Sequence, residues 1–269
     1  MNNVDRQPPD SADLQKPFGM EFLDFACILL PHIDYDSQLR AIGSLLDLHR
    51  QNAKRRSEAI LGIERELPDL SGVQSDLAND ERVEMLHGSV YEDAAHSMAA
   101  IGMLAPLIET IFYHAFQSAR PYFGDAAEQL LFHRKLEADA ETRWDCRFIW
   151  TKGKKVGNSV EGIMQLSAAI GLDEFLPSNI RQTLSAIFAY RNKMFHLGFE
   201  WPTDERKRFS ARIVSEKWPA NWFVWATTNS EPWVCYMTDA LISECVTQID
   251  TVLHALGRFA VEKLPDPTG

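Results

Sequence analysis

Cysteine and positive charge are both scarce in this sequence. Its 269 residues include four cysteines, which stand alone at Cys27, Cys146, Cys235 and Cys245. They form no C-x-x-C pair and no regular spacing of the kind found in disulfide-rich proteins or thiolate metal sites. Lysine and arginine number 27 against 38 aspartates and glutamates, which gives a formal net charge of -11. We therefore expect a reducing, cytoplasmic setting, and a protein that coats nucleic acid with its whole surface is excluded.

Long apolar runs are also missing. The most apolar stretch, residues 98–108, is interrupted by Gly102 and Pro106 and ends at Glu109, well short of the ~20 residues that cross a bilayer. Residues 1–17 are polar and contain proline, without the basic-then-apolar order of a secretion signal. We expect a protein that has no membrane partner and a disordered lead-in over 1–17.

No sequence motif for a metal ion or a cofactor is present. The chain has no H-E-x-x-H, no G-x-x-x-x-G-K-[ST] and no G-x-S-x-G. Its eight histidines are scattered rather than clustered with cysteines. We therefore expect neither a metal nor a cofactor.

Apolar residues recur at helical spacing along nearly the whole chain, without a repeat of about 20 to 50 residues. This pattern predicts an all-α fold in which 18–269 form a single helical domain. The acidic segment 68–80 and the basic segment 151–159 are expected to be loops. Pro106 is expected to kink or end its helix, because proline lacks a backbone donor. Helical segments are expected at about 18–30, 37–66, 90–119, 125–148, 159–170, 180–197 and 236–261.

Residues 199–233 differ in composition from the rest of the chain. Five of the seven tryptophans lie there, and the segment NWFVWATT has the aromatic and β-branched content of a strand. We expect a small aromatic-rich hairpin or loop insertion at this point in the helical fold. The five residues are Trp201, Trp218, Trp222, Trp225 and Trp233.

The helix expected after Pro177-Ser178-Asn179 carries a charge in its apolar stripe. Residues Ile180, Leu184 and Ile187 begin the stripe, and Arg191 occupies the next position in it. A cation on a buried face is costly unless it meets an anionic side chain or an anionic ligand. Arg191 is therefore a candidate functional residue.

Arg191 opens the hexapeptide RNKMFH, in which Asn192 follows the arginine and His196 ends the segment. This hexapeptide resembles the R-x4-6-H motif of the HEPN family, in which a polar residue follows the arginine. The resemblance implies a HEPN-type helical bundle over about 90–262. It also implies a metal-independent endoribonuclease, a class often found in toxins and phage-defence proteins that act as dimers. A second match, Arg82 to His87, lacks the polar residue, and we expect Arg82 to be an ordinary solvated helix charge.

The resemblance and the chemistry of these side chains suggest a role for each. His196 would transfer a proton, and Arg191 would bind the phosphate and stabilise the charge of the transition state. Asn192, one helical turn from His196, would orient the imidazole. HEPN proteins commonly carry a polar or acidic residue on an earlier helix, so the resemblance suggests that Glu109 pairs with Arg191. Two-fold dimerisation would bring two such sets to one cleft.

The charge distribution favours RNA as the partner. Residues 181–220 hold eight basic and four acidic residues, a local +4 that leaves -15 for the rest of the chain. The tryptophans nearby would either stack on bases or pack in the core. The residues predicted to bind RNA are Lys193, Arg206, Lys207, Arg208 and Arg212.

The leading hypothesis is a cytoplasmic HEPN-type endoribonuclease that cleaves RNA by attack of a 2′-hydroxyl on the adjacent phosphate. It would act as a homodimer in a toxin or phage-defence role, with an antitoxin or regulatory protein as a further candidate partner. Two alternatives stay open. One is a non-catalytic helical module that binds RNA, a nucleotide or a protein. The other is a structural polar network formed by Arg191 and His196 at a dimer seam.

Overall fold

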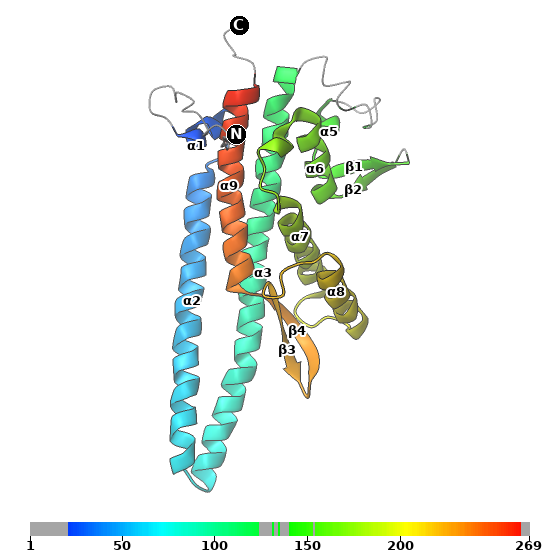
Figure 1. The fold of residues 1–269 in the computed structure, drawn as a ribbon. Helices are drawn as coiled ribbons and strands as arrows, with labels where there is room; N and C mark the ends of the chain where they lie inside the picture. The colour runs from blue at the N-terminus through cyan, green and yellow to red at the C-terminus, as the bar shows by residue number, and fades with distance from the viewer. Residues whose placement is uncertain (1–20, 124–130, 132–133, 135–139, 153, 265–269) are drawn as a thin grey trace, which may run out of the picture.

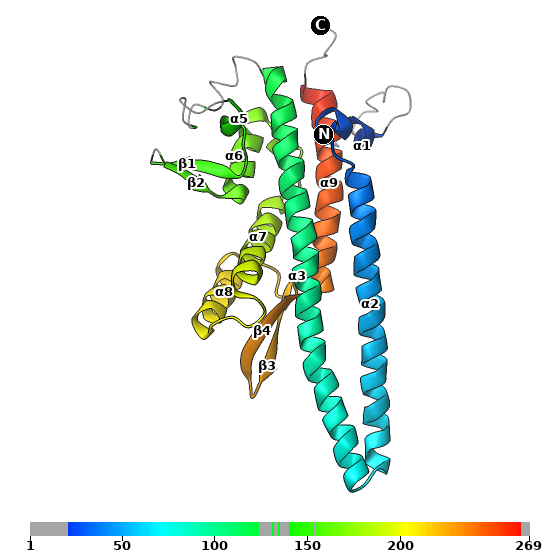
Figure 2. The ribbon, with the colours of Figure 1, turned by 180° about the vertical axis from the view of Figure 1, so that it is seen from behind.

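A computed structural model describes residues 21–123, 131, 134, 140–152 and 154–264. The protein is mainly α-helical, with two small two-stranded antiparallel sheets. Two long helices, α2 (Tyr35–Glu66) and α9 (Asp239–Lys263), pack on the longest, α3 (Val73–Phe123), and smaller elements lie on the other side of α3 (Figures 1 and 2). The lead-in expected over 1–17, and much of the helical segment expected over 125–148, lie outside the described residues.

The helices α2 and α3 form a long antiparallel hairpin that extends beyond the end of α9 (Figure 1). Asp34 caps α2 by accepting a hydrogen bond from the Ser37 backbone at 2.9 Å. The turn consists of the short 3-10 helix η3 (Leu67–Asp69) and Gly72, whose φ of +58° suits glycine. The loop predicted over 68–80 is therefore wrong beyond residue 72. The segment is polar because this end of the hairpin is largely exposed, and it is helical nonetheless.

Helix α3 has 51 residues, a length of about 75 Å at 1.5 Å per residue. It continues through Pro106, so of the two alternatives, a kink or an end, the end is wrong. Buried neighbours such as Leu104, Ala105 and Ile108 hold the helix in the core on both sides. By length and composition α3 is also apolar enough to span a membrane. However, a core helix passes the same test, and 56% of the most apolar window of α3 is buried inside the protein.

The core lies where α3 and α9 meet α6 (Ser159–Ile170) and α7 (Ile180–Leu197). Glycine permits two close approaches there. A methyl group at Gly162 of α6 would overlap the carbonyl oxygen of Cys146, and one at Gly257 of α9 would overlap that of Phe22. The first contact seats α6 against the start of β1 (Phe148–Thr151). The second seats α9 against α1 (Phe22–Phe25) and the 3-10 helix η2 (Ala26–Ile28).

Two hairpins interrupt the helical pattern. β1 pairs with β2 (Lys154–Gly157), so the loop predicted over 151–159 is in part a strand. The aromatic hairpin predicted near 199–233 is present as β3 (Phe223–Thr228) and β4 (Glu231–Met237), and it extends past residue 233. It follows a helix that was not predicted, α8 (Thr203–Ser215), in which Phe209 is the one buried residue. Two short elements complete the described chain, α5 (Ala140–Arg143) and η4 (Leu172–Glu174).

Candidate functional site

The RNKMFH segment forms the last two turns of α7. This helix begins at Ile180 and ends at Leu197, as the sequence predicts. Gly198 terminates it with φ of 72° and ψ of -149°, and its backbone N–H donates to the Met194 carbonyl. That combination of angles is almost restricted to glycine, so Gly198 determines where the motif helix stops.

Arg191 lies between α7 and α3. Its Nη1 is 3.5 Å from Oε2 of Glu109, and its Cζ lies 5.1 Å from the centroid of the Phe188 ring. The Arg191 side chain is 28% exposed and the Glu109 side chain is 20% exposed. The cation in the apolar stripe therefore has the acidic partner that was expected, and the pair still reaches solvent on one side.

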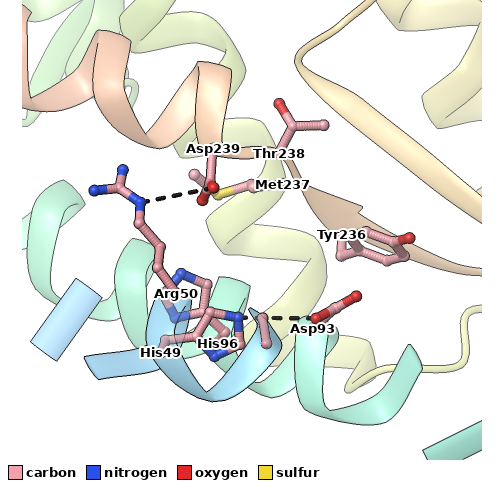
Figure 3. A pocket seen from close by; sticks show the side chains of 9 residues that line it. His49, Arg50, Asp93, His96, Tyr236, Met237, Thr238 and Asp239 are labelled. Carbon is pink, nitrogen blue, oxygen red and sulfur yellow. Dashed lines mark ion pairs between the residues drawn. The ribbon is translucent and has the colours of Figure 1, made fainter. Parts of the chain in front are cut away.

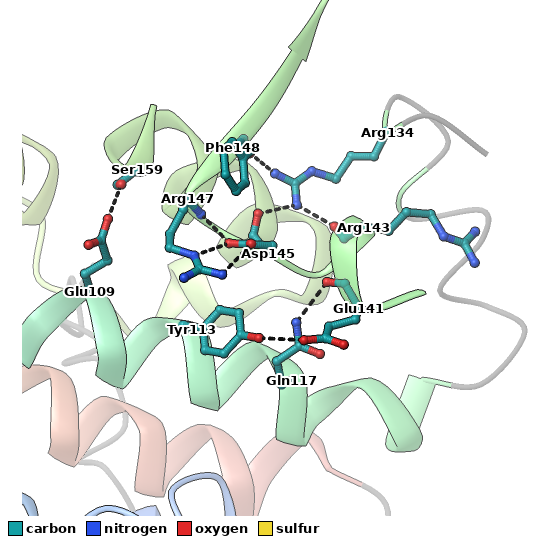
Figure 4. Close-up of polar contacts among 10 residues, drawn as sticks. All are labelled: Glu109, Tyr113, Gln117, Arg134, Glu141, Arg143, Asp145, Arg147, Phe148 and Ser159. Atoms are coloured by element: carbon teal, nitrogen blue, oxygen red, sulfur yellow. Dashed lines mark hydrogen bonds and ion pairs between the residues drawn. The ribbon is translucent and has the colours of Figure 1, made fainter. Parts of the chain in front are cut away.

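The side chain of Asn192 contacts Arg191. Its side-chain oxygen accepts hydrogen bonds from Nε and Nη2 of Arg191 at 3.4 and 3.3 Å. The guanidinium thus reaches the neighbouring amide, and among the described residues the hydrogen bonds found for the Asn192 side chain are to Arg191. Glu109 is held in turn by Ser159 at the start of α6, whose hydroxyl donates to it (Figure 4). Helices α3, α6 and α7 thus meet at this ion pair.

Arg191 lines a pocket of about 390 Å³, the arginine pocket. Among the residues that the structure describes around it, three are arginines and none is a carboxylate, although the chain as a whole carries -11. Such a lining presents positive charge toward any bound group. The lining residues are Arg147, Gly157, Asn158, Ser159, Val160, Ser185, Phe188, Ala189, Arg191, Asn192 and Arg212.

The other two arginines of the pocket are also fixed by carboxylates. Arg147 Nε and Nη2 donate to the two oxygens of Asp145 at 2.9 and 2.7 Å (Figure 4). Burial opposes ionisation of Asp145, but the bonds from Arg147 outweigh it and hold the pKa of Asp145 below its usual value. Arg212 Nε lies 3.1 Å from Glu216 Oε1, and its Nη2 lies 3.3 Å from the Ser185 hydroxyl. Each guanidinium is therefore held in place before any ligand binds.

His196 does not join this pocket. It is exposed on α7 and is not among the described residues that line the pocket. It follows Arg191 by five positions, which turns the two side chains about 140° apart around the helix axis. Next to it, Phe195 is 56% exposed and its ring lies beside Gly102 of α3. A single chain thus presents the arginine and the histidine of the motif to different surroundings.

The basic segment 181–220 is largely paired within the chain. Lys193 and Arg208 both form ion pairs with Glu205. Arg206 donates to the Pro232 carbonyl and, at 3.0 Å, to the Thr203 hydroxyl. Lys207 is exposed and lines, with Arg206, a smaller pocket of about 230 Å³. Of the five residues predicted to bind RNA, Arg212 alone lies among the described lining of the arginine pocket.

Three of the five clustered tryptophans belong to the core. Trp201, Trp218 and Trp222 are buried, and the rings of Trp201 and Trp218 pack on Phe209. They are not available to stack on RNA bases, so for these three the core alternative is correct. Trp233 is partly exposed and stacks on His87.

The second R-x4-H match has ordinary surroundings. Arg82 forms an ion pair with Glu64 at 3.4 Å between α2 and α3, and His87 packs on Trp233 with ring centroids 5.2 Å apart. Arg82 is less solvated than predicted, since its side chain is only 29% exposed. Neither residue lies among the described lining of the arginine pocket.

A second pocket, of about 290 Å³, lies between α2, α3, β4 and the start of α9 (Figure 3). The rings of His49 and His96 stack in parallel there, with centroids 3.5 Å apart. Burial lowers the pKa of both imidazoles, to about 4 for His96. Asp93 and Asp239 also line this pocket. Even so, no group of three or more His, Cys, Asp or Glu within the described ranges is arranged to hold a metal ion.

No protein-family model, curated protein or solved structure matches this chain. Sequence reasoning found Arg191, Asn192 and Arg212 of the arginine pocket but missed Arg147 and Ser185. Neither has a motif of its own: Arg147 lies just before β1 and Ser185 lies on α7, and the tertiary packing brings both to one pocket.

Proposed function

We propose that the protein is a metal-independent endoribonuclease of the HEPN type. The observation that carries this proposal is the position of Arg191, in a pocket with two further arginines and no carboxylate among its described lining residues. Guanidinium groups bind phosphate oxygens in a bidentate manner, and groups that are already fixed lose little freedom on binding. The arginine pocket suits an RNA phosphate even though the chain is acidic overall.

The proposed reaction needs two proton transfers and no metal. The ribose 2′-oxygen loses its proton and attacks the adjacent phosphorus, while the bond from phosphorus to the 5′-oxygen breaks and that oxygen takes up a proton. The products are a 2′,3′-cyclic phosphate and a 5′-hydroxyl. Arg191 would stabilise the additional charge on the phosphorane, and His196 would carry one of the proton transfers. Glu109 and Asn192 would position Arg191.

Dimerisation would place the motifs of two chains beside each other. Phe195, exposed beside His196 on α7, is a suitable apolar anchor for a two-fold contact, since large exposed apolar side chains often mark interfaces. A two-fold axis across this face would bring both His196 side chains to one cleft. An antitoxin or regulatory protein that covers the same face would block it. A cytoplasmic toxin or phage-defence role is part of this proposal.

The second candidate is a non-catalytic module that binds RNA or a nucleotide in the arginine pocket. It is favoured by one observation: His196 is not among the described residues that line the pocket. This candidate predicts phosphate-dependent binding without strand cleavage.

Cleavage of a labelled single-stranded RNA in the presence of EDTA separates the two candidates. The wild-type chain is expected to cleave, and His196→Ala and Arg191→Ala are expected to lower the rate by about 10²- to 10⁴-fold, the usual contribution of a proton-transfer or charge-stabilising group. His254→Ala, which removes a half-exposed histidine on α9, is the control and should retain the full rate. Undiminished cleavage by His196→Ala would contradict the proposal, and a wild-type chain that binds RNA without cutting it would favour the second candidate.

A further inference from the structure

We infer that the arginine pocket binds a phosphomonoester, the terminal phosphate of a nucleotide or of an RNA 5′ end, between Arg147 and Arg212. For an RNA ligand the inference rests on the proposed ribonuclease function, and for a free nucleotide it stands alone. Arg191 would still bind the phosphate at which the RNA chain is cleaved. The pocket would thus hold a second phosphate beside the reacting one.

Arg147 forms one wall of the site. It lies just before β1, and its guanidinium is clamped on one edge by Asp145, whose own side chain is buried. Its Cζ lies 4.5 Å from the centroid of the Tyr113 ring, which supports the group from one face. Arg147 nevertheless remains half-exposed. A guanidinium fixed on one edge and open elsewhere is prepared to receive an anion.

Arg212 of α8 forms another wall and is held in a similar way. Its Cζ lies 5.4 Å from the centroid of the Trp218 ring, and Glu216 and Ser185 accept from its nitrogens. The side chain is 45% exposed. Because Glu216 is not among the described residues of the lining, the cation rather than the pair faces the pocket.

Partial charges of the same sign add to these full charges. The start of α6 contributes Asn158, Ser159 and Val160 to the lining. Asn158 caps this 12-residue helix by accepting from the Glu161 backbone at 3.1 Å. The positive end of the helix dipole therefore faces a pocket that already contains three arginines.

Between Arg147 and Arg212 the charge favours a monoester over a diester. A phosphodiester in the RNA backbone carries one negative charge and continues as a chain on both sides. A phosphomonoester carries roughly -1.5 to -2 at neutral pH, with three free oxygens, and enters a pocket by its end. With Arg191 left for the reacting phosphate, the guanidinium groups of Arg147 and Arg212, without a carboxylate among the described lining residues, match the second group. The pocket volume of about 390 Å³ falls within the range of roughly 300–1,000 Å³ typical of small-ligand sites.

Calorimetric titration with adenosine 5′-monophosphate, and with adenosine as the probe without phosphate, tests the site. The wild-type chain is expected to bind the monophosphate and to bind adenosine at least about 10-fold more weakly, because charge-assisted bonds to phosphate are lost. Arg147→Gln and Arg212→Gln should each weaken binding of the monophosphate by about 10-fold on the same grounds. Equal affinity for the two probes would overturn the inference.

Arg258→Gln is a closely matched control for Arg212→Gln. Arg258 also pairs with a glutamate four residues further along its helix, is 49% exposed, and lies 5.3 Å above a ring, that of Phe175. It should leave the affinity unchanged. If Arg258→Gln weakens binding as much as Arg212→Gln, the effect is a general loss of charge and the pocket is not the site.

RNA oligonucleotides with a 5′-phosphate and with a 5′-hydroxyl distinguish the two sources of the ligand. Preference for the phosphorylated oligonucleotide, lost in Arg147→Gln, identifies an RNA end as a ligand, whereas binding of the mononucleotide alone identifies a nucleotide site. Either result supports the phosphomonoester site. A chain that binds the monophosphate and does not cleave RNA contradicts the ribonuclease proposal only. A chain that cleaves RNA and binds neither phosphorylated probe contradicts this inference only.

Discussion

At the scale of single residues, the position of Arg191 depends on three side chains from two helices, α3 and α7. Glu109 of α3 pairs with it, Asn192 accepts from it, and Phe188 lies under the guanidinium. Removal of Glu109 would destabilise the folded chain, because the partly buried charge of Arg191 would lose its ion-pair partner. The same contacts leave one side of Arg191 open to the pocket.

Replacement of Glu109 tests this dependence. Glu109→Ala is expected to lower the free energy of unfolding by about 1–3 kcal/mol, since Arg191 and the Ser159 hydroxyl both lose an acceptor. Glu109→Gln should cost less, because an amide oxygen still accepts. Chemical denaturation measures both, with Glu262→Ala on α9 as the control, since Glu262 has a similar exposed fraction and pairs with Arg258. A loss for Glu109→Ala no greater than the control's would show that the ion pair does not hold the site together.

Sequence reasoning could identify Arg191 because a charge in an apolar stripe is visible without a structure, and the need for an anionic partner follows from its burial. It could not find Arg147, whose neighbours in sequence give no such contrast. It also assigned Asn192 to His196 by helical spacing. The i, i+4 rule places two Cβ atoms on one face, but the flexible guanidinium of the adjacent residue reaches the amide first.

At the scale of secondary-structure elements, the strongly amphipathic helices were predictable and the weakly patterned ones were not. Helices α6, α7 and α9 have broad apolar faces, and their observed bounds lie close to those expected. Helix α8 buries only Phe209 among its 13 residues, so periodicity could not reveal it. The start of α3 is exposed on the hairpin and carries little apolar signal for the same reason.

The contact between α2 and α3 predicts a pH dependence of stability. Burial lowers the pKa of His49 and His96, so between pH ~6.5 and ~4 the unfolded chain binds protons that the folded chain does not. The contribution of these two neutral histidines to the free energy of unfolding is therefore expected to be fully present above pH ~6.5 and to be lost as the pH drops toward ~4. Burial also raises the pKa of Asp93, which opposes this trend. The charged and titratable groups around the pair are Arg50, Arg56, Asp93, Tyr236 and Asp239.

His96→Phe keeps a stacked ring and removes its titration. Its melting temperature should fall less than that of the wild-type chain between pH 7 and pH 5, measured by circular dichroism. His254→Phe, at a half-exposed histidine of α9, should follow the wild-type curve. Parallel curves for the wild type and His96→Phe would contradict the assignment of the pH dependence to the stacked pair.

At the scale of the whole molecule, acidity and phosphate binding are compatible because the positive charge is local. The chain carries -11, and most of the basic residues near the motif are paired within it. The three arginines that line the arginine pocket are paired as well, but their carboxylate partners are not among the described residues of its lining. Ligand binding is therefore expected to be confined to that pocket rather than spread along a surface.

The exposed Phe195 predicts the oligomeric state. If this face forms the two-fold contact, light scattering should give twice the chain mass of 30.6 kDa. Phe195→Asp should give a folded monomer, because the side chain is 56% exposed, and RNA cleavage should be lost with the dimer. Val224→Asp is the control, since it places the same charge at an exposed apolar position of β3 rather than on α7. A wild-type monomer that cleaves RNA would contradict the dimeric site.

The chemical ends of the RNA fragments test the central claim most directly. Mass spectrometry of the fragments formed in the presence of EDTA is expected to find a 2′,3′-cyclic phosphate on one side of the cut and a 5′-hydroxyl on the other. Neither end should form with His196→Ala. Fragments that carry a 3′-hydroxyl and a 5′-phosphate, or cleavage that stops when divalent metal is removed, would contradict attack by the 2′-hydroxyl and with it the proposed function.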